Sequence, residues 1–213
     1  IVVLAAVLPP APPSSTAAEP TDAQAYQQAI DRAIEYLRTQ EQTPDGSYAA
    51  HAGPGVTAVV TAGILRAGRS PADPLVARSL QYLETFVQPD GGVYQAGAFY
   101  QNYETCLAML CFREANADGR YDALLAAAER FIKKIQWDAD EGHDKESYSY
   151  GGAGYGQHKR PDLSNTQFLV DALRAVGNDP DDEAMQKALT FVSRCQNLES
   201  PHNTTRFSAK NPD

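Results

Sequence analysis

The chain contains the segment Arg32-Ala33-Ile34-Glu35-Tyr36-Leu37, and its pattern of side chains returns three more times. The later copies are Arg78-Ser79-Leu80-Gln81-Tyr82-Leu83, Ala127-Ala128-Glu129-Arg130-Phe131-Ile132 and Lys187-Ala188-Leu189-Thr190-Phe191-Val192. Each copy leads into a glutamine, and these are Gln40, Gln88, Gln136 and Gln196. A repeat of this length indicates one supersecondary unit copied along the chain, in which each copy buries its apolar face on its neighbours.

Each repeat has the pattern of two helices joined by a loop. In the first helix of each pair, apolar residues recur at three- and four-residue spacing, which is typical of an amphipathic outer helix. The second helix is apolar on most of its surface, so we expect it to be buried on several sides. The sequence predicts an all-α fold with outer helices over residues 23–41, 73–87, 121–136 and 181–195, and inner helices over residues 56–67, 103–114 and 164–176.

Composition narrows the class of partner. The 213 residues carry a formal net charge of -9 and show no stripe of Lys and Arg, so we expect neither nucleic acid nor an anionic membrane surface as a partner. The three cysteines form no Cys-x-x-C pair. Because Cys106 and Cys111 lie in an apolar helical pattern, we expect both to be buried as small apolar side chains.

The first residues have the pattern of a secretory signal. Residues 1–8 are an uncharged apolar run, prolines follow, and small residues offer a cleavage region near Ala17 or Ala18. The apolar run is too short to span a bilayer. We therefore expect a secreted or periplasmic protein with no stable membrane span. Its parts would be a signal remnant and disordered lead-in (1–22), a repeat domain (23–197) and a polar C-terminal segment that looks cut short (198–213).

The four repeated segments resemble the repeat of the squalene-cyclase and protein-prenyltransferase superfamily. That repeat runs basic, small, two residues, aromatic, aliphatic, a spacer, Gln, and then Gly-x-aromatic. Arg32-Ala33-x-x-Tyr36-Leu37 and Lys187-Ala188-x-x-Phe191-Val192 match its opening, and Gly46-Ser47-Tyr48 and Gly92-Val93-Tyr94 match its close. The resemblance implies an α/α toroid, two concentric rings of helices around a cavity that holds an isoprenoid in the family's enzymes. Since a full ring needs more helix pairs, we expect an incomplete toroid of about seven helices.

The resemblance also points to ligand contacts where loops meet the starts of inner helices. Aromatic faces there could wall an apolar cavity and stabilise a cation. Each ring could equally serve only to pack the end of a loop. The candidate cavity residues are Tyr48, Tyr94, Tyr100, Tyr103, Tyr150, Tyr155 and Asn165. The expected partner is an isoprenoid or another apolar small molecule, and a protein partner stays open.

One position bears on catalysis. Cyclases of the squalene-hopene type protonate their substrate with an Asp-x-Asp-Asp motif near the start of an inner helix. Here the third inner helix begins Asp162-Leu163-Ser164-Asn165, so Asp162 is the only candidate acid in that motif. An isolated exposed Asp titrates at about pH 4 and is a poor acid for an alkene. The sequence more simply indicates a helix N-terminal residue whose charge complements the helix dipole.

No metal or cofactor is predicted. Prenyltransferases of the superfamily bind zinc through Asp, Cys and His, but no Asp-x-Cys occurs and no histidine is near a cysteine in sequence. The alternating acidic residues of 138–146 resemble calcium ligands without the glycine and glutamate positions of an EF-hand, which favours a solvated acidic loop. Motifs for phosphate binding or serine hydrolysis are also missing.

Two functions stay open at this stage, because fold alone does not choose between them. The first is an exported repeat protein that binds an apolar ligand or a partner in the toroid cavity. The second is an active terpenoid cyclase or prenyltransferase-type enzyme whose catalytic residues lie in further C-terminal repeats. A polysaccharide-active toroid would need paired carboxylates. Asp45 and Asp90 stand at equivalent repeat positions, but their Asp-Gly turns explain them without catalysis.

Overall fold

The structure is a computed structural model that describes residues 21–156, 160–196 and 200–203. These residues form α-helices and no β-strand. The seven helices are α1 (Asp22–Tyr36), α2 (Pro54–Arg66), α3 (Pro74–Glu84), α4 (Gln101–Glu114), α5 (Asp122–Lys134), α6 (Leu163–Ala175) and α7 (Glu183–Cys195). A π-helical turn (Leu37–Glu41) extends α1, and short 3₁₀ turns cover Ala50–Ala52 and Ala139–Glu141. The predicted seven helices are confirmed, with ends that shift by a few residues.

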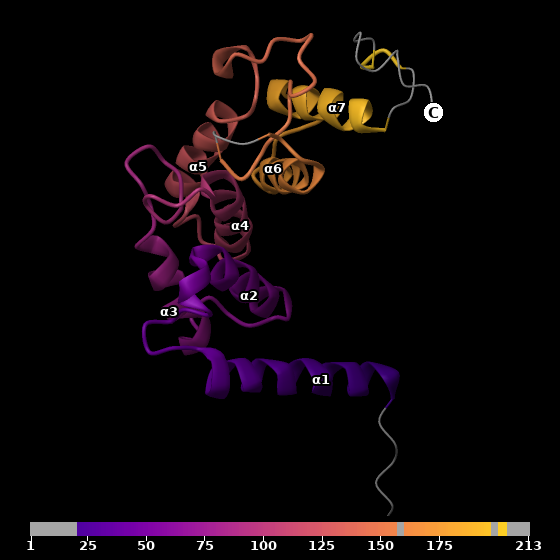
Figure 1. Cartoon of the computed structure of the whole chain (residues 1–213). Coiled ribbons are helices and arrows are strands. Elements are labelled where there is room, and N and C mark those ends of the chain that lie inside the picture. Colours follow the sequence, from indigo (N-terminus) through magenta and orange to yellow (C-terminus); the bar gives the residue numbers. More distant parts are fainter. Residues whose placement is uncertain (1–20, 157–159, 197–199, 204–213) are drawn as a thin grey trace, which may run out of the picture.

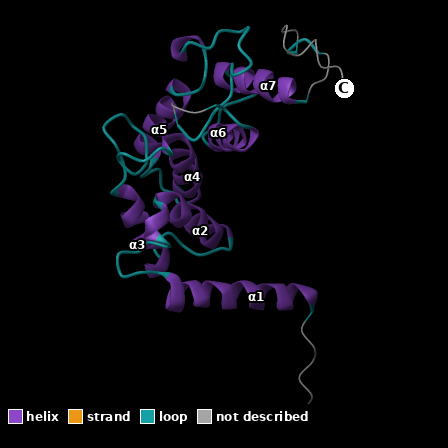
Figure 2. Ribbon diagram, in the orientation of Figure 1, coloured by secondary structure: helices purple, strands orange, loops and turns teal. Residues whose placement is uncertain are grey.

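The helices alternate between two layers that curve into an arc (Figure 1). Helices α2, α4 and α6 pack side by side along the inner side of the arc. Helices α3, α5 and α7 each pack against one or two of these inner helices, and loops join the successive elements (Figure 2). This alternation of outer and inner helices confirms the prediction of part of an α/α toroid.

The core lies between the two layers, and burial follows the predicted helix faces. Outer helix α7 buries a single stripe, formed by Ala184, Ala188 and Phe191. Inner helix α4 is buried over most of its surface. Cys106 and Cys111 are fully buried in α4, as expected, and burial raises the pKa of the Cys111 thiol to about 12.

A glycine turn in each repeat packs against the next outer helix. The turn glycines are Gly46, Gly91 and Gly151, with φ angles of 92°, 95° and 83°. Their α-carbons lie against the backbone carbonyls of Arg78, Ala127 and Lys187, respectively. Glycine is needed at the turn because the φ angle is positive and a β-carbon has no room. Each contacted residue is followed by a small buried residue, and these are Ser79, Ala128 and Ala188.

A buried threonine of each inner helix binds the same turn from the other side. Its hydroxyl accepts a hydrogen bond from the backbone N–H two residues after the turn glycine. The pairs, N–H first, are Tyr48 with Thr57 at 2.9 Å, Val93 with Thr105 at 3.0 Å, and Ala153 with Thr166 at 3.0 Å. This register makes Tyr48 equivalent to Val93, whereas the Gly-x-aromatic pattern paired it with Tyr94.

The long loop of the third repeat is an insertion at one point of this turn. Trp137 donates its backbone N–H to the carbonyl of the residue after the turn glycine, as Thr43 and Gln88 do in the earlier repeats. Gly91 follows Gln88 by three positions, whereas Gly151 follows Trp137 by fourteen. Residues 138–148, the acidic stretch, are therefore an extra segment inserted into a hydrogen-bond pattern that the repeats share.

Helix α1 differs from the other outer helices on one side. The aromatic residues of the repeated segments on α5 and α7, Phe131 and Phe191, are 6% and 5% exposed, whereas Tyr36 on α1 is 55% exposed. The later outer helices each receive a turn glycine from the repeat before them, and the described residues place no such turn on α1. Exposure of the aromatic residue is thus greatest on the outer helix that receives no turn glycine within the described residues.

Two expectations concern residues outside the described part of the chain. The signal pattern of residues 1–20 and most of the polar segment 198–213 lie there. None of the described helices has both the length and the apolar character that a membrane span requires.

Candidate functional site

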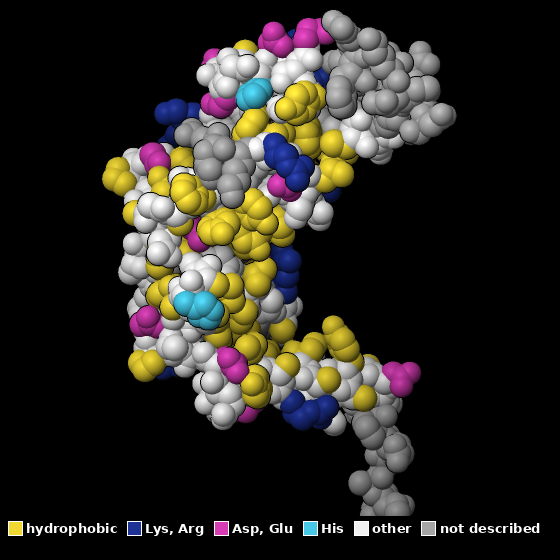
Figure 3. Space-filling view, viewed as in Figure 1, with side chains coloured by type: hydrophobic (Ala, Val, Ile, Leu, Met, Phe, Trp, Pro, Cys, Tyr) yellow, Lys and Arg dark blue, Asp and Glu magenta, His cyan; other side chains and the backbone are white. Residues whose placement is uncertain are grey.

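A hollow of about 770 Å³ opens where loops meet the starts of the inner helices. Its lining comes from the turn before α2, the loop before α4, the first turns of α4 and α6, and the loop that ends near Tyr155. Hydrophobic side chains gather over the middle of the face shown in Figure 3, in the region of α4. The hollow thus lies where loops meet the starts of the inner helices, which is the location that the resemblance indicated for ligand contacts.

Four aromatic rings form one wall of the hollow. The ring of Tyr155 stands edge-on to those of Tyr100 and Tyr103, with centroids 5.3 and 5.9 Å apart. Tyr103 in turn stands edge-on to Phe168, at 5.2 Å. Edge-to-face pairs of this kind each contribute about 0.5–1.5 kcal/mol beyond the area they bury. We define Tyr100, Tyr103, Tyr155 and Phe168 as the aromatic wall.

Asn102 holds the loop that carries Tyr155 against the start of α4. Its backbone N–H donates to the Tyr155 carbonyl and its side-chain Nδ2 donates to the Gly154 carbonyl, both at 3.0 Å. Asn102 is buried, so breaking these bonds would leave polar groups without partners in the core. The aromatic wall is thus positioned by hydrogen bonds between segments about fifty residues apart.

Glu104 is the single carboxylate that lines the hollow within the described residues, and it is only 2% exposed. Its Oε2 accepts a hydrogen bond from the backbone N–H of Gln95 at 2.8 Å. Burial raises the pKa of Glu104 above its usual value, and the bond from Gln95 opposes that rise. The sequence analysis did not select Glu104. The available signal was a charged residue among the apolar residues of a predicted inner helix.

The threonine register relates Glu104 to the start of α6. Glu104 precedes Thr105 and is therefore equivalent to Asn165, which precedes Thr166. Asp162 caps α6: its Oδ1 accepts from the backbone N–H of Asn165 and its Oδ2 accepts from the Asn165 side chain, both at 2.8 Å. The interpretation of Asp162 as a helix N-terminal residue is confirmed, and its two oxygens both face its own helix.

The structure brings some of the candidate cavity residues together and not others. Those in the hollow are Tyr100, Tyr103 and Tyr155. Tyr48 is buried in the core. Tyr94 donates its hydroxyl to Asp90 at 2.6 Å, away from the hollow. Tyr150 is buried beneath the guanidinium of Arg194, which lies 5.9 Å from the ring centroid. Asn165 is buried beside Asp162 and does not line the hollow.

Several acidic residues of the turns and the insertion are hydrogen-bonded to nearby groups. Asp45 and Asp90 each accept a backbone N–H two residues on, at 3.0 Å, as their turn context predicts. Asp138, at the start of the insertion, accepts from Lys187 Nζ at 2.6 Å. Burial acts to raise the pKa of Asp138, but the hydrogen bond and charge of Lys187, together with bonds from Asp140 and Glu141, outweigh it and the pKa is lowered. Within the described residues, no three His, Cys, Asp or Glu side chains are grouped to hold a metal ion.

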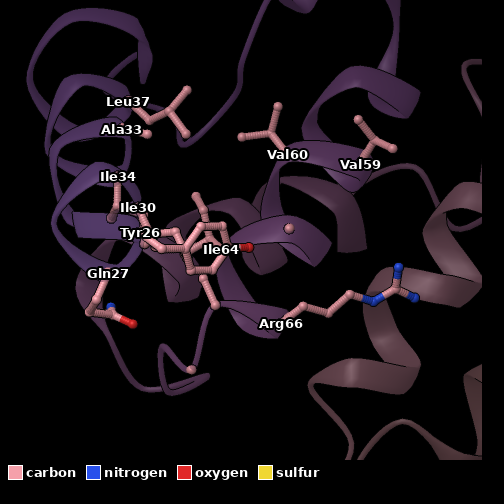
Figure 4. A pocket seen from close by; sticks show the side chains of 13 residues that line it. Tyr26, Gln27, Ile30, Ala33, Ile34, Leu37, Val59, Val60, Ile64 and Arg66 are labelled. Carbon is pink, nitrogen blue, oxygen red and sulfur yellow. The ribbon is translucent and has the colours of Figure 1, made fainter. Parts of the chain in front are cut away.

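A second concave surface runs between α1 and α2 (Figure 4). This groove has a volume of about 700 Å³, and Tyr26 and Ile30 of α1 face Ile64 of α2 across it. Its lining is apolar except for a few residues such as Arg66, whose Nε is bonded to Glu114 at 2.7 Å. The groove lacks the aromatic wall and the buried carboxylate, so we take the hollow as the candidate site.

The family model described as the squalene-hopene cyclase C-terminal domain matches residues 52–211. No curated protein and no solved structure matches the chain.

Proposed function

Because this chain belongs to the squalene-hopene cyclase C-terminal domain family, we propose that it binds an apolar small molecule of the isoprenoid class in the hollow. The observation that supports this most directly is the aromatic wall at the starts of α4 and α6. Pockets for small molecules have volumes of about 300–1,000 Å³ and are lined mainly by apolar and aromatic side chains with a few polar groups. The hollow, at about 770 Å³, matches that description.

The proposal is for binding, because residues 162–165 lack the acidic motif with which a cyclase of the squalene-hopene type protonates its substrate. The first residue of Asp162-Leu163-Ser164-Asn165 uses both carboxylate oxygens to hold its own helix. Ser164 and Asn165 stand where a cyclase of the squalene-hopene type has carboxylates. The family match favours a second candidate, an enzyme that converts the isoprenoid with residues outside the described part of the chain.

We also propose that the protein is exported, from the signal-like pattern of residues 1–18. Secretion would place the hollow in an extracytoplasmic compartment, where a scavenged or transported lipid could reach it. N-terminal sequencing of the protein recovered from culture medium or periplasm tests this. A mature chain that retains Ile1–Leu8 would contradict it.

The binding proposal is tested by equilibrium dialysis of the full chain against labelled squalene and labelled geranylgeraniol. Tyr155→Ala removes one ring of the aromatic wall at a residue that is 41% exposed, so the core is left in place. We expect this change to weaken binding about tenfold, which corresponds to about 1.4 kcal/mol. Tyr26→Ala, in the groove between α1 and α2, is the matched control and should leave binding unchanged.

The outcomes separate the alternatives. Loss of binding in Tyr26→Ala but not in Tyr155→Ala would move the ligand to the groove. No binding of either probe to the unaltered chain would refute the proposal. Extraction of a probe with changed mass or retention would establish the enzymatic candidate.

A further inference from the structure

Glu104 is a buried carboxyl group with no cationic partner in the described part of the chain. It forms no ion pair there, whereas the partly buried carboxylates of Asp138 and Asp182 pair with lysines. Among the described residues, one hydrogen bond reaches its side chain, from the backbone N–H of Gln95 to Oε2. Carboxylates are rarely buried unless they are paired, because removing a charge from water is costly. The carboxyl group of Glu104 therefore lacks the counter-charge that a buried carboxylate usually has, as far as the described residues go.

The second oxygen of Glu104 lies at the hollow. Oε1 occupies the space that a β-carbon on Gly53 would take, and both residues line the hollow. Gly53 has a φ angle of 83°, so the backbone itself is shaped in a way that leaves room for this oxygen. Within the described residues, Oε1 accepts no hydrogen bond, so one lone-pair-bearing atom is left for a ligand.

The remaining groups around the hollow suit a positive charge. Besides Glu104, the titratable residues that line it are His51 and the three tyrosines of the aromatic wall, and no Lys or Arg side chain of the described residues does so. The faces of aromatic rings attract cations, most strongly when water is excluded. The net charge of -9 also raises the concentration of cations near the surface.

We propose that Glu104 anchors a cationic amino group, so that the ligand of the hollow is an apolar molecule with an amine or quaternary ammonium head. The apolar body would lie on the aromatic wall and the head would pair with Oε1. This inference rests on the proposed function, because it assigns a head group to the ligand of the same hollow. A cation supplies the counter-charge that the described residues do not provide, whereas a neutral alcohol would leave the carboxylate uncompensated.

The test compares octyltrimethylammonium with octanol, by isothermal titration calorimetry on the full chain at physiological salt and below micellar concentrations. The two probes share an alkyl chain and differ in the head group. We expect the cation to bind at least about tenfold more tightly than the alcohol, since the attraction between close opposite charges at a binding site contributes at least that much. In Glu104→Gln this preference should disappear while octanol binding is kept. Glu35→Gln, an exposed change on α1, should retain the preference.

Each outcome decides between the two proposals. Equal affinity of the unaltered chain for both probes would overturn the cation proposal and leave apolar binding in place. A preference for the cation that persists in Glu104→Gln would also overturn it, because the net charge would then explain the effect. If neither probe binds the unaltered chain, the proposed function fails together with the inference. Because the first comparison needs no variant, the test holds even if Glu104→Gln folds poorly.

Discussion

Gly91 lies against the backbone carbonyl of Ala127, and a β-carbon placed on Gly91 would sit 2.7 Å from that oxygen. The same relationship joins Gly46 to Arg78 and Gly151 to Lys187. Each contact links the turn of one repeat to the outer helix of the next. The glycine turn of one repeat and the repeated segment on the next outer helix therefore form one packing unit that spans two neighbouring repeats.

The turn contact predicts that Gly91→Ala is more destabilising than its φ angle alone explains. Gly177 is the matched control, because its φ angle of 98° is similar but nothing lies within 4 Å of its β-carbon position. We expect Gly177→Ala to cost about 1 kcal/mol from backbone strain, and Gly91→Ala about 3 kcal/mol from strain plus overlap. Urea denaturation measures both. Equal losses would show that packing against Ala127 contributes nothing.

The threonine that binds each turn predicts a second loss of stability. Thr105→Val keeps the side-chain shape but removes the hydroxyl that accepts from the buried N–H of Val93. Leaving that N–H without a partner should cost about 1–3 kcal/mol. Thr85→Val removes an exposed hydroxyl that donates to the Tyr82 carbonyl, and should cost much less. Thermal and urea unfolding of the two variants compare them, and similar stabilities would argue against the register drawn from these threonines.

Burial of Glu104 predicts a specific dependence of stability on pH. Its pKa is raised in the folded chain, so the folded state holds the proton more tightly than the unfolded state. Stability from this group is fully present below its unfolded pKa of about 4.3 and is lost as pH rises through the folded pKa. Glu104→Gln removes the titration, so we expect its stability relative to the unaltered chain to be higher at pH 7 than at pH 4. A relative stability that does not change between these pH values would contradict this.

The ion pair between Lys187 and Asp138 predicts that α7 holds the inserted segment 138–148. The pair is mostly buried, with side chains 18% and 14% exposed, and Arg194 of α7 also donates to two carbonyls of the insertion. Lys187→Met should cost about 2 kcal/mol and expose the insertion to limited proteolysis. Lys134→Met, at an exposed lysine that forms no ion pair within the described residues, serves as the control. Cleavage that is no faster in Lys187→Met would show that the insertion is held by other contacts.

The repeat glutamines show where sequence reasoning stopped. Gln136 donates its side-chain amide to the carbonyls of Gly151 and Ala184, at 2.9 and 3.0 Å, and so joins the turn to the next outer helix. In the first repeat this role belongs to Gln42, which donates to the Leu75 carbonyl at 2.8 Å. The sequence pattern pointed to Gln40, which is exposed. Spacing along the chain could not settle this, because the π-helical turn (Leu37–Glu41) changes the register.

The residues of the candidate site were likewise predicted only in part from the sequence. The sequence placed Tyr100, Tyr103 and Tyr155 at the ends of loops, and the structure shows that their rings meet. It did not select Glu104, because a glutamate near the start of a helix is common, and its position among apolar residues did not by itself show that the carboxyl group is buried. That burial depends on Gly53 and on the loop before α4.

The amino-acid sequence by itself determined the repeats, the seven helices and which of them are outer and inner. These properties follow from the periodicity of apolar residues, which reflects how each helix is buried, and from turn residues such as Asp-Gly, which are recognisable in the local sequence. Only the tertiary structure decided the hollow, the aromatic wall and the unpaired carboxyl group of Glu104. The physical reason is that these depend on contacts between residues far apart in the chain, such as Asn102 with Gly154, whose geometry no local pattern encodes.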